Sequence, residues 1–407
     1  MPDTPVTTAD SAPPRTPCAD APGTPCADTP GTAPAARTAK DAPAGRSPRA
    51  VAADTRPAAR EGGAAATAAL LGAARRAANR RLTLVWAVLL LLLVGLLAAS
   101  LLLGGLRTFG VGDVLPAAFG MRTGIADYVI HRIRLPRALA ALLGGALFGL
   151  AGALYQRLVR NPLATPDIVG VSAGAGAGAV TMLLLVPAVP LGVEAAAVGG
   201  AFALVGAVLA LSRSGGKVDT YRLVIIGIGL AAVCTAYTNY LFTSAGKQGL
   251  SQVMRWLIGS VSGATWDGVT TLAVSLAVCA LCTVPVHRAL SALSLGDDLA
   301  AGLGSRVGAA RTAALLLGAA AAALATGVVG PIGFVSLVSG PIAARLVGTD
   351  RALVLAPAVG AAIVLGADVA AQHGPLISPV PTGAVTALIG APYFVLLILR
   401  RGQGAPS

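Results

Sequence analysis

The chain has 407 residues, of which 55% are hydrophobic and 12% charged, and its mean hydropathy is +0.78. This composition excludes an ordinary soluble domain and is typical of an α-helical protein that crosses a membrane several times. The formal net charge is +13, but lysine and arginine stand mostly at the ends of apolar runs, which is the pattern of membrane topology signals. We therefore predict an all-α polytopic membrane protein with no nucleic-acid partner.

Residues 1–74 differ in composition from the rest, being rich in Ala, Pro, Thr and Asp, and they contain the tandem repeat TPCADAPG and TPCADTPG. A segment with so few large apolar side chains buries too little surface to offset the entropy of ordering it, so it is predicted to be a disordered tail. The basic run ARRAANRR follows and predicts that the tail stays on the cytoplasmic side. Residues 75–402 are predicted to form the transmembrane domain.

The first apolar run covers residues 82–106. Later runs begin near residues 138, 168, 193, 221, 269, 311, 331, 352 and 383. These runs predict about ten helices that are long enough to cross the hydrocarbon core. An even number of crossings also places the C-terminus in the cytoplasm, on the side that the terminal Arg400 and Arg401 favour.

The segment HRIRLPRALA, residues 131–140, breaks this charge rule, since the helix count places Arg132, Arg134 and Arg137 on the external side. The arginine stems could lie along the helix end while their guanidinium groups reach lipid phosphate. Alternatively, the cluster could dock an acidic partner, because arginine pairs with carboxylates through two hydrogen bonds. Pro136 begins the helix and holds Arg134 and Arg137 near its N-terminus, which favours docking.

The next stretch carries glycines at 145, 149 and 152, which lie on one helical face and predict close approach of another helix. Asn161-Pro162 then interrupts the chain. The alternating glycines at 174, 176 and 178 follow no strand and lack the spacing of a dinucleotide fingerprint, so we exclude a Rossmann site. The phosphate-binding pattern G-x-x-x-x-G-K-[ST] does not occur in the sequence either.

Three features of the later sequence allow more than one interpretation. Cys279 and Cys282 form a C-x-x-C inside an apolar run and are predicted to pack there, with redox or metal chemistry as the alternative. Asp368 is the clearest acid in an apolar run and is either functional or a packing residue near the helix end. The stretch GDDLAAGL, residues 296–303, predicts a short helix that is either a connector or a lever moved by a soluble partner.

Several stretches together resemble the FecCD family of permease subunits of iron–siderophore and cobalamin ABC importers. They are RLPRALAALLGGAL, RNPLATPDIVGVSAGAGAG, RWLIGSVSGATW, LGDDLAAGLG, GPIGFVSLV and TGAVTALIGAPYF. They occur in the family's order and span residues 80–400. The resemblance implies the type II ABC importer architecture, with about ten transmembrane helices per permease subunit.

The resemblance also implies partners and a location in the cytoplasmic membrane. Two permease subunits, identical or related, would join two ATP-binding subunits, and an extracytoplasmic substrate-binding protein would deliver the substrate. The chain itself is then no enzyme and binds no cofactor, because ATP is used by the partner ATPase. The implied substrate is an iron–siderophore chelate, with cobalamin or haem as alternatives in the same family. An ion-coupled secondary transporter is the rival from another class.

The family's functional positions carry over to three groups of residues. The residues expected to dock the binding protein are Arg134, Arg137 and Arg132. Those expected to couple to the ATPase are Leu295, Gly296, Asp297, Asp298, Leu299, Gly302 and Gly304. The pathway or structural motif comprises Gln156, Asn161, Pro162, Gly170, Ser172, Gly174 and Asp368.

The chain departs from the family pattern at four positions. Gly340 and Pro341 stand where the family usually has Pro-His, Gln372 replaces a common arginine, and Pro379 replaces a common glutamate. Loss of this arginine and glutamate predicts weaker or altered docking at the last external loop. It also permits a heteromeric arrangement, in which a related permease supplies the missing contacts.

Overall fold

The computed structural model describes residues 56–103, 116, 125–186, 190–214, 217–244, 247–373 and 380–402. The predicted disorder of residues 1–55 and the departure at Pro379 lie outside these residues. The chain divides into two units, residues 1–66 and 67–407, and the fold described below is that of the second.

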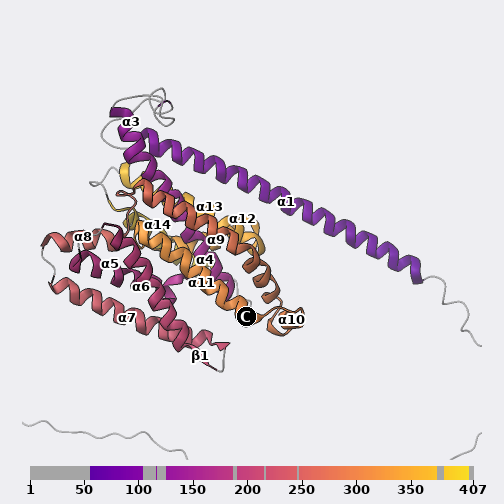
Figure 1. The fold of residues 1–407 in the computed structure, drawn as a ribbon. Helices are drawn as coiled ribbons and strands as arrows, with labels where there is room; N and C mark the ends of the chain where they lie inside the picture. Colours follow the sequence, from indigo (N-terminus) through magenta and orange to yellow (C-terminus); the bar gives the residue numbers. More distant parts are fainter. Residues whose placement is uncertain are drawn as a thin grey trace, which may run out of the picture. The chain divides into compact units, whose positions relative to one another are not determined.

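Ten apolar helices make up most of this fold (Figure 1). They are α1 (Arg56–Leu103), α4 (Leu135–Val159), α5 (Val171–Leu185), α6 (Pro190–Leu211), α7 (Thr220–Ser244), α9 (Trp266–Leu293), α11 (Val307–Val329), α12 (Val335–Val347), α13 (Thr349–His373) and α14 (Thr382–Gly402). Among the described residues, seven candidate spans are long and apolar enough to cross a membrane, and α5, α12 and α14 hold shorter apolar segments. The prediction of about ten membrane helices is therefore confirmed.

Shorter elements connect these helices. They are α3 (Ile125–Val129), the π-helix η1 (Ile130–Arg134), the 3-10 helix η2 (Pro166–Val169), β1 (Arg213–Ser214), β2 (Lys217–Val218), α8 (Lys247–Ile258) and α10 (Asp297–Gly302). The two short strands pair antiparallel, with Arg213 opposite Val218. The helix predicted within residues 296–303 is α10, whereas α3, η1 and α8 were not predicted.

α1 begins at Arg56, well before the predicted start of the first apolar run at residue 82. Residues 56–74 are therefore helical, although the sequence places them in the disordered tail. The physical reason is their alanine content, because alanine has the highest helix propensity of all residues and needs no partner to favour the helix.

α4 is the central helix of the bundle and packs against α9, α11, α12 and α13. Its glycines permit this packing. A Cβ atom added at Gly149 would lie 2.3 Å from the backbone oxygen of Ala356 in α13, and one at Gly152 would lie 1.8 Å from the backbone oxygen of Ser336 in α12. Gly145 makes a similar approach to α13. The predicted small-residue face of this helix is thus confirmed.

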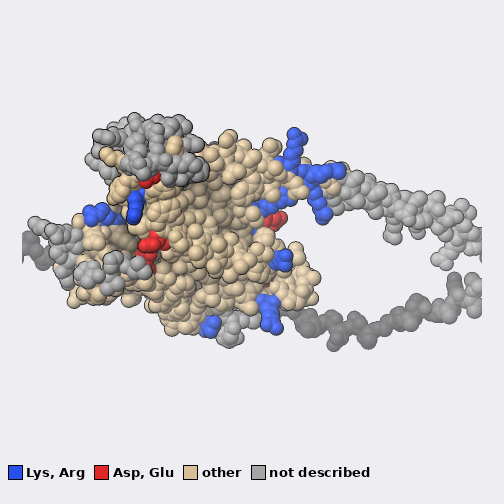
Figure 2. All heavy atoms as spheres, turned by 45° about the horizontal axis from the view of Figure 1, so that its top comes forward, with Lys and Arg blue, Asp and Glu red and all other residues tan. Residues whose placement is uncertain are grey.

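The outward faces of several helices expose large apolar side chains, as expected of surfaces that contact lipid. Examples are Leu91 in α1, Ile228 in α7 and Leu281 in α9. Figure 2 shows lysine and arginine gathered mainly towards opposite sides of the visible face, with a broad region of uncharged residues between them. This arrangement fits a bundle whose charged ends flank the membrane.

Hydrogen bonds that cross the bundle define its two ends. At one end, Arg137 of α4 pairs with Asp368 of α13. At the other, Arg157 of α4 donates to the backbone oxygen of Asp350, the second residue of α13, over 3.0 Å. We call the end with the Arg137–Asp368 pair the Arg137 end. The end with the Arg157–Asp350 bond is the α10 end, because α10 follows the C-terminus of α9 there (Figure 1). α4 connects the two ends, and at 1.5 Å per residue Arg137 and Arg157 are about 30 Å apart along it.

Candidate functional site

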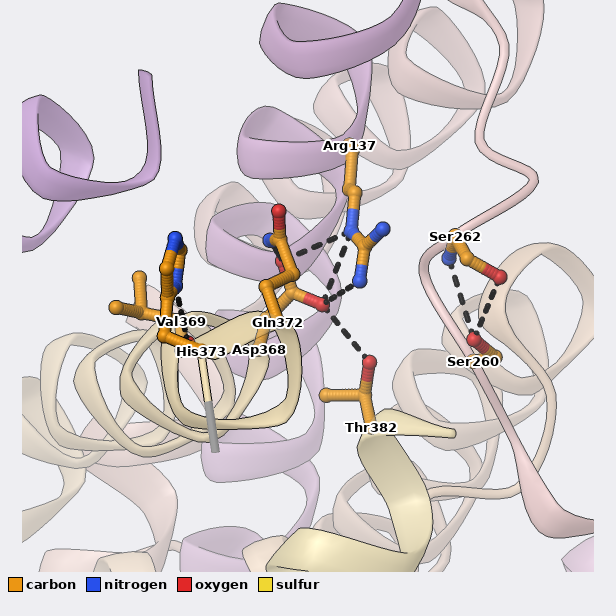
Figure 3. A network of polar contacts seen from close by, with 8 residues as sticks. All are labelled: Arg137, Ser260, Ser262, Asp368, Val369, Gln372, His373 and Thr382. Carbon is orange, nitrogen blue, oxygen red and sulfur yellow. Dashed lines mark hydrogen bonds and ion pairs between the residues drawn. The ribbon is translucent and has the colours of Figure 1, made fainter. Parts of the chain in front are cut away.

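A buried polar network ties three helices together at the Arg137 end (Figure 3). Arg137 Nε lies 3.1 and 3.0 Å from the two carboxylate oxygens of Asp368, and Arg137 Nη2 donates to Oδ1 over 2.9 Å. Gln372 Nε2 donates to Oδ2 over 2.7 Å, and the Thr382 hydroxyl donates to Oδ1 over 3.0 Å. Because these residues come from α4, α13 and α14, the carboxylate holds those helices in one arrangement.

Gln372 acquires a role here that the sequence did not reveal. It lies one helical turn after Asp368 on α13 and adds a neutral donor to a carboxylate that Arg137 already neutralises. An arginine at this position would place a second cation beside the pair. The neutral amide leaves one cation and one anion, which is the charge balance that a buried ion pair requires.

Arg134 lies in a different environment from Arg137. Arg134 is only 6% exposed. Its Nη1 atom donates to the backbone oxygen of Leu101 over 2.5 Å and lies 3.5 Å from the backbone oxygen of Leu102. These carbonyls belong to the last turn of α1, where backbone oxygens lack partners within the helix. The guanidinium also lies at the negative end of the helix dipole. Arg134 therefore fastens α1 to η1.

These contacts restrict the predicted docking site without testing it. Arg132 is exposed, Arg134 is buried, and the side chain of Arg137 is 17% exposed and bound to Asp368. Docking by all three residues stays a prediction. Of the three, Arg132 alone presents an exposed side chain to a partner.

The predicted motif after α4 builds a compact turn. Asn161 accepts a hydrogen bond from the backbone nitrogen of Leu163 over 3.0 Å, and its own nitrogen donates to Gln156 O over 3.2 Å. The Ser172 hydroxyl donates to the carboxylate of Asp167. These bonds, with Pro162 in the same turn, give the motif a structural role.

Two glycines of the same region are required by geometry. Gly170 has φ +81°, a left-handed conformation that side chains disfavour, and it joins η2 to α5. A Cβ atom at Gly174 would lie 2.6 Å from the backbone oxygen of Gly200, so α5 and α6 pack closely there. The larger role of this region in a transport pathway stays a prediction.

Gln156 explains one departure from the family pattern. Its buried side chain donates to the backbone oxygens of Ser336 and Leu337 in α12, over 3.2 and 3.0 Å. A Cβ atom at Gly340 would lie 1.8 Å from Gln156 Oε1. The glycine therefore leaves the space that this side chain occupies. Pro341 continues α12 as a buried residue.

Leu299 in α10 and Leu295 and Leu303, which flank it, are exposed, and we call these three residues the leucine row. Leu295 is 60% exposed, Leu299 64% and Leu303 70%. They lie four residues apart, and glycines with positive φ, Gly296 at +110° and Gly304 at +81°, bound the segment. Leu295 and Leu299 were among the predicted coupling residues, whereas Leu303 was not, although the same spacing could have identified it. These side chains are therefore available for contact with a partner, and their role in coupling stays a prediction.

The remaining predicted coupling residues shape and anchor this helix. Asp297 pairs with Arg311 of α11 over 3.0 Å, and both side chains are largely exposed, so the pair contributes about 0–1 kcal/mol. Asp298 is exposed in the first turn, where an acid suits the helix dipole. Gly302 ends the helix.

A cavity of about 610 Å³ opens beside this helix, where α4, α9, α11, α12 and α13 end or begin. Its lining includes four arginines: Arg157, Arg160, Arg311 and Arg345. In the sequence, arginines in these turns indicate only membrane topology, because nothing in their local spacing shows that they converge.

In the part of the chain that the structure describes, no three His, Cys, Asp or Glu side chains lie close enough together to hold a metal ion. Cys279 is buried in the core, and Cys282 is exposed.

Comparison with known proteins gives consistent results. A family model described as the FecCD transport family matches residues 68–400. The ferric enterobactin transport system permease FepG of Escherichia coli (strain K12) is 34% identical over 307 residues, which cover 74% of this chain and 92% of the relative. The cobalamin import permease BtuC of Halobacterium salinarum is 35% identical over 291 residues, covering 70% and 77%.

A solved structure shares the fold. It is that of a transporter assigned to the metal-chelate ABC type, in an inward-facing conformation. The TM-score is 0.68 at 28% sequence identity, with 77% of this chain and 97% of the other covered.

Proposed function

The chain belongs to the FecCD transport family, and from that premise we propose that it carries an iron–siderophore chelate through the cytoplasmic membrane. It is a transport permease, and the ATPase of such an importer is a separate subunit. The observation that carries the proposal is the family match over residues 68–400, which contain every candidate span of the described chain. Ferric enterobactin, which the relative FepG transports by its name, is a chelate of this class.

In the proposed assembly, the α10 end faces the cytoplasm and the Arg137 end faces outward. The exposed leucine row of α10 supports this orientation, because an aqueous subunit could cover it, and the ATP-binding subunit is that partner. The arginines of the α10 end agree with the excess of positive charge on the cytoplasmic side. Both chain termini then lie in the cytoplasm, and a second permease copy, identical or related, completes the membrane part.

At the outer end, a substrate-binding protein delivers the chelate. Arg132 is the exposed arginine of the predicted docking cluster. Arg134 and Arg137 support this site by fixing η1 and the start of α4. Arginine fits an acidic partner because its planar group donates two parallel hydrogen bonds to a carboxylate.

Cobalamin is the second candidate substrate, since the cobalamin permease of Halobacterium salinarum is as similar to the chain as FepG is. An ion-coupled mechanism lacks comparable support. It would need Asp368 to exchange ions, yet this carboxylate is 0% exposed and accepts hydrogen bonds from three residues.

Uptake by reconstituted vesicles tests the proposed function. The permease, its ATPase and its binding protein would be assembled in liposomes and supplied with radioactive iron in different siderophores, or with labelled cobalamin. We expect ATP-dependent accumulation of a ferric siderophore. Accumulation of cobalamin and of no siderophore would show that cobalamin is the substrate. Ion-driven uptake by the purified permease without an ATPase would refute both.

A further inference from the structure

The arginine-lined cavity at the α10 end carries a charge that the protein itself does not neutralise. Arg157 donates to Asp350 O and to the Ser291 hydroxyl, over 3.0 and 3.1 Å, and lies 3.2 Å from His287 Nδ1. These acceptors are uncharged groups, apart from the titratable imidazole. No carboxylate among the described residues lies within salt-bridge distance of this guanidinium.

Two further cavity arginines also have neutral partners. Arg160 donates to the backbone oxygen of Leu293, and Arg345 lies 5.8 Å from the centre of the Tyr393 ring. Arg311 differs because it pairs with an acid of α10. Asp350 contributes the one acidic side chain of the described lining. The cavity thus has an excess of positive charge and several unused guanidinium donors.

Arg160 occupies a backbone conformation that argues for a use of its side chain. It ends α4 with φ 55° and ψ 30°, in the left-handed region where glycine is the favoured residue. A side chain is disfavoured in this conformation, because its Cβ atom crowds the following carbonyl oxygen. Glycine would relieve this strain, and the arginine that stands here instead places a guanidinium in the lining of the cavity.

The lining of the cavity includes both buried residues and exposed helix ends. Its inner lining is formed by buried residues of α4 and α12, such as Gln156 and Pro341. Its exposed lining residues lie at helix ends and turns, among them Arg160, Ser294 and Asp350. α9, α11, α12 and α13 pack against α4, and each of them contributes residues to the lining.

We propose that this cavity receives an acidic segment of the ATPase subunit, as a second contact beside the leucine row of α10. The inference rests on the proposed function. The Asp297–Arg311 pair connects α10 to one of the arginines that line the cavity, so a partner that covers α10 also lies near the cavity. Carboxylates from the partner would bind Arg160 and Arg345 in the two-hydrogen-bond geometry that arginine favours, and the leucines would contribute apolar area.

The test measures affinity between the purified permease in nanodiscs and its ATPase subunit at several salt concentrations. The double variant Arg160→Gly/Arg345→Gln should bind on the order of tenfold more weakly at low salt and lose most of the salt dependence. Arg222→Gln, an exposed arginine at the start of α7 outside the cavity, should bind as the wild type does. Leu299→Asn should weaken binding while keeping the salt dependence.

Thermal unfolding of each variant verifies that its fold is intact. Unchanged affinity and salt dependence in a folded Arg160→Gly/Arg345→Gln variant would overturn the inference while Leu299→Asn still weakens binding. Native mass spectrometry supplies a second contradicting outcome. If it detects an acidic phospholipid bound to the wild type and not to this variant, a lipid occupies the cavity and the inference is overturned. Failure of the wild type to bind any ATPase would instead refute the proposed function on which the inference depends.

Discussion

Asp368 shows how one residue can hold several membrane helices in place. Its carboxylate is fully buried and accepts hydrogen bonds from Arg137, Gln372 and Thr382, which lie on three helices. A buried charge is tolerated only when it is paired and its remaining acceptor positions are filled, and both conditions are met here. The residue therefore serves helix packing, one of the two roles that its position in the sequence allowed.

Removal of this charge should destabilise the fold strongly. Asp368→Asn leaves the Arg137 guanidinium unpaired in a largely buried position, and we expect the free energy of unfolding to fall by about 3 kcal/mol. Thermal unfolding of the purified permease in detergent measures the effect. Asp298→Asn, which removes an exposed acid of α10, should leave the Tm unchanged.

A double variant separates charge from packing. Arg137→Met/Asp368→Leu replaces the pair with apolar side chains and should recover most of the lost stability, because removal of both charges leaves no unpaired ion. If the double variant is as unstable as Asp368→Asn, the ion pair is not the origin of the effect.

At the scale of elements, α4 organises the bundle through its glycine face. Helices in a membrane gain little from the hydrophobic effect against one another, so close van der Waals packing supplies much of their association. Gly149 and Gly152 allow α13 and α12 to approach until backbone oxygens lie where a Cβ atom would be. Those contacts are with backbone atoms, which cannot move aside as a flexible side chain can.

Gly152→Ala should therefore be destabilising although alanine favours helices. The added methyl group overlaps the Ser336 backbone oxygen, and we expect a loss of about 1–3 kcal/mol in the free energy of unfolding. The matched control is Gly95→Ala in α1, where nothing lies within 4 Å of the added atom. Its Tm should rise slightly. Equal Tm changes in the two variants would contradict the close packing of α4.

α10 is the element most clearly shaped for a partner. It is short, it is bounded by glycines with positive φ, and its neighbouring leucines are exposed. Asp297 anchors it to α11, so a force applied to this helix reaches the bundle. We expect it to transmit motion of the ATPase.

Leu299→Asn should lower the affinity of the ATPase subunit by about 1–2 kcal/mol, because it removes an apolar side chain that association would bury. Pull-down or surface binding with purified subunits measures this change. The control is Leu211→Asn at the end of α6, where a leucine of similar exposure, 60%, lies outside α10. Equal losses of affinity in both variants would show that the α10 row is not the interface.

At the scale of the whole molecule, the two ends have different chemistry. The Arg137 end combines an internal polar network with the exposed Arg132. The α10 end combines exposed leucines with an arginine-lined cavity. α4 passes through the bundle and ends in both sites, so a shift at one end has a rigid path to the other. This arrangement suits a permease that is loaded at one end and driven at the other.

Docking at the outer end should depend on Arg132. Arg132→Glu is expected to weaken association with the binding protein by on the order of one to a few kcal/mol at low ionic strength, and by less at high salt. The control is Arg288→Glu, which makes the same change of charge. Arg288 is an exposed arginine near the C-terminus of α9, at the α10 end. If the Arg132→Glu variant in nanodiscs binds the substrate-binding protein as tightly as the wild type does, Arg132 is not part of the docking site.

The sequence alone determined the membrane class, the approximate positions of ten apolar helices apart from the start of α1, the glycine face of α4 and the short helix at residues 296–303. Each of these follows from local composition or periodicity, which a neighbouring segment cannot change. Only the tertiary structure decided that Arg137 pairs with Asp368, 231 residues away, that Arg134 is buried against α1, and that four arginines line one cavity. Local sequence specifies that a residue carries charge, but its partner and its burial depend on which helices pack beside it.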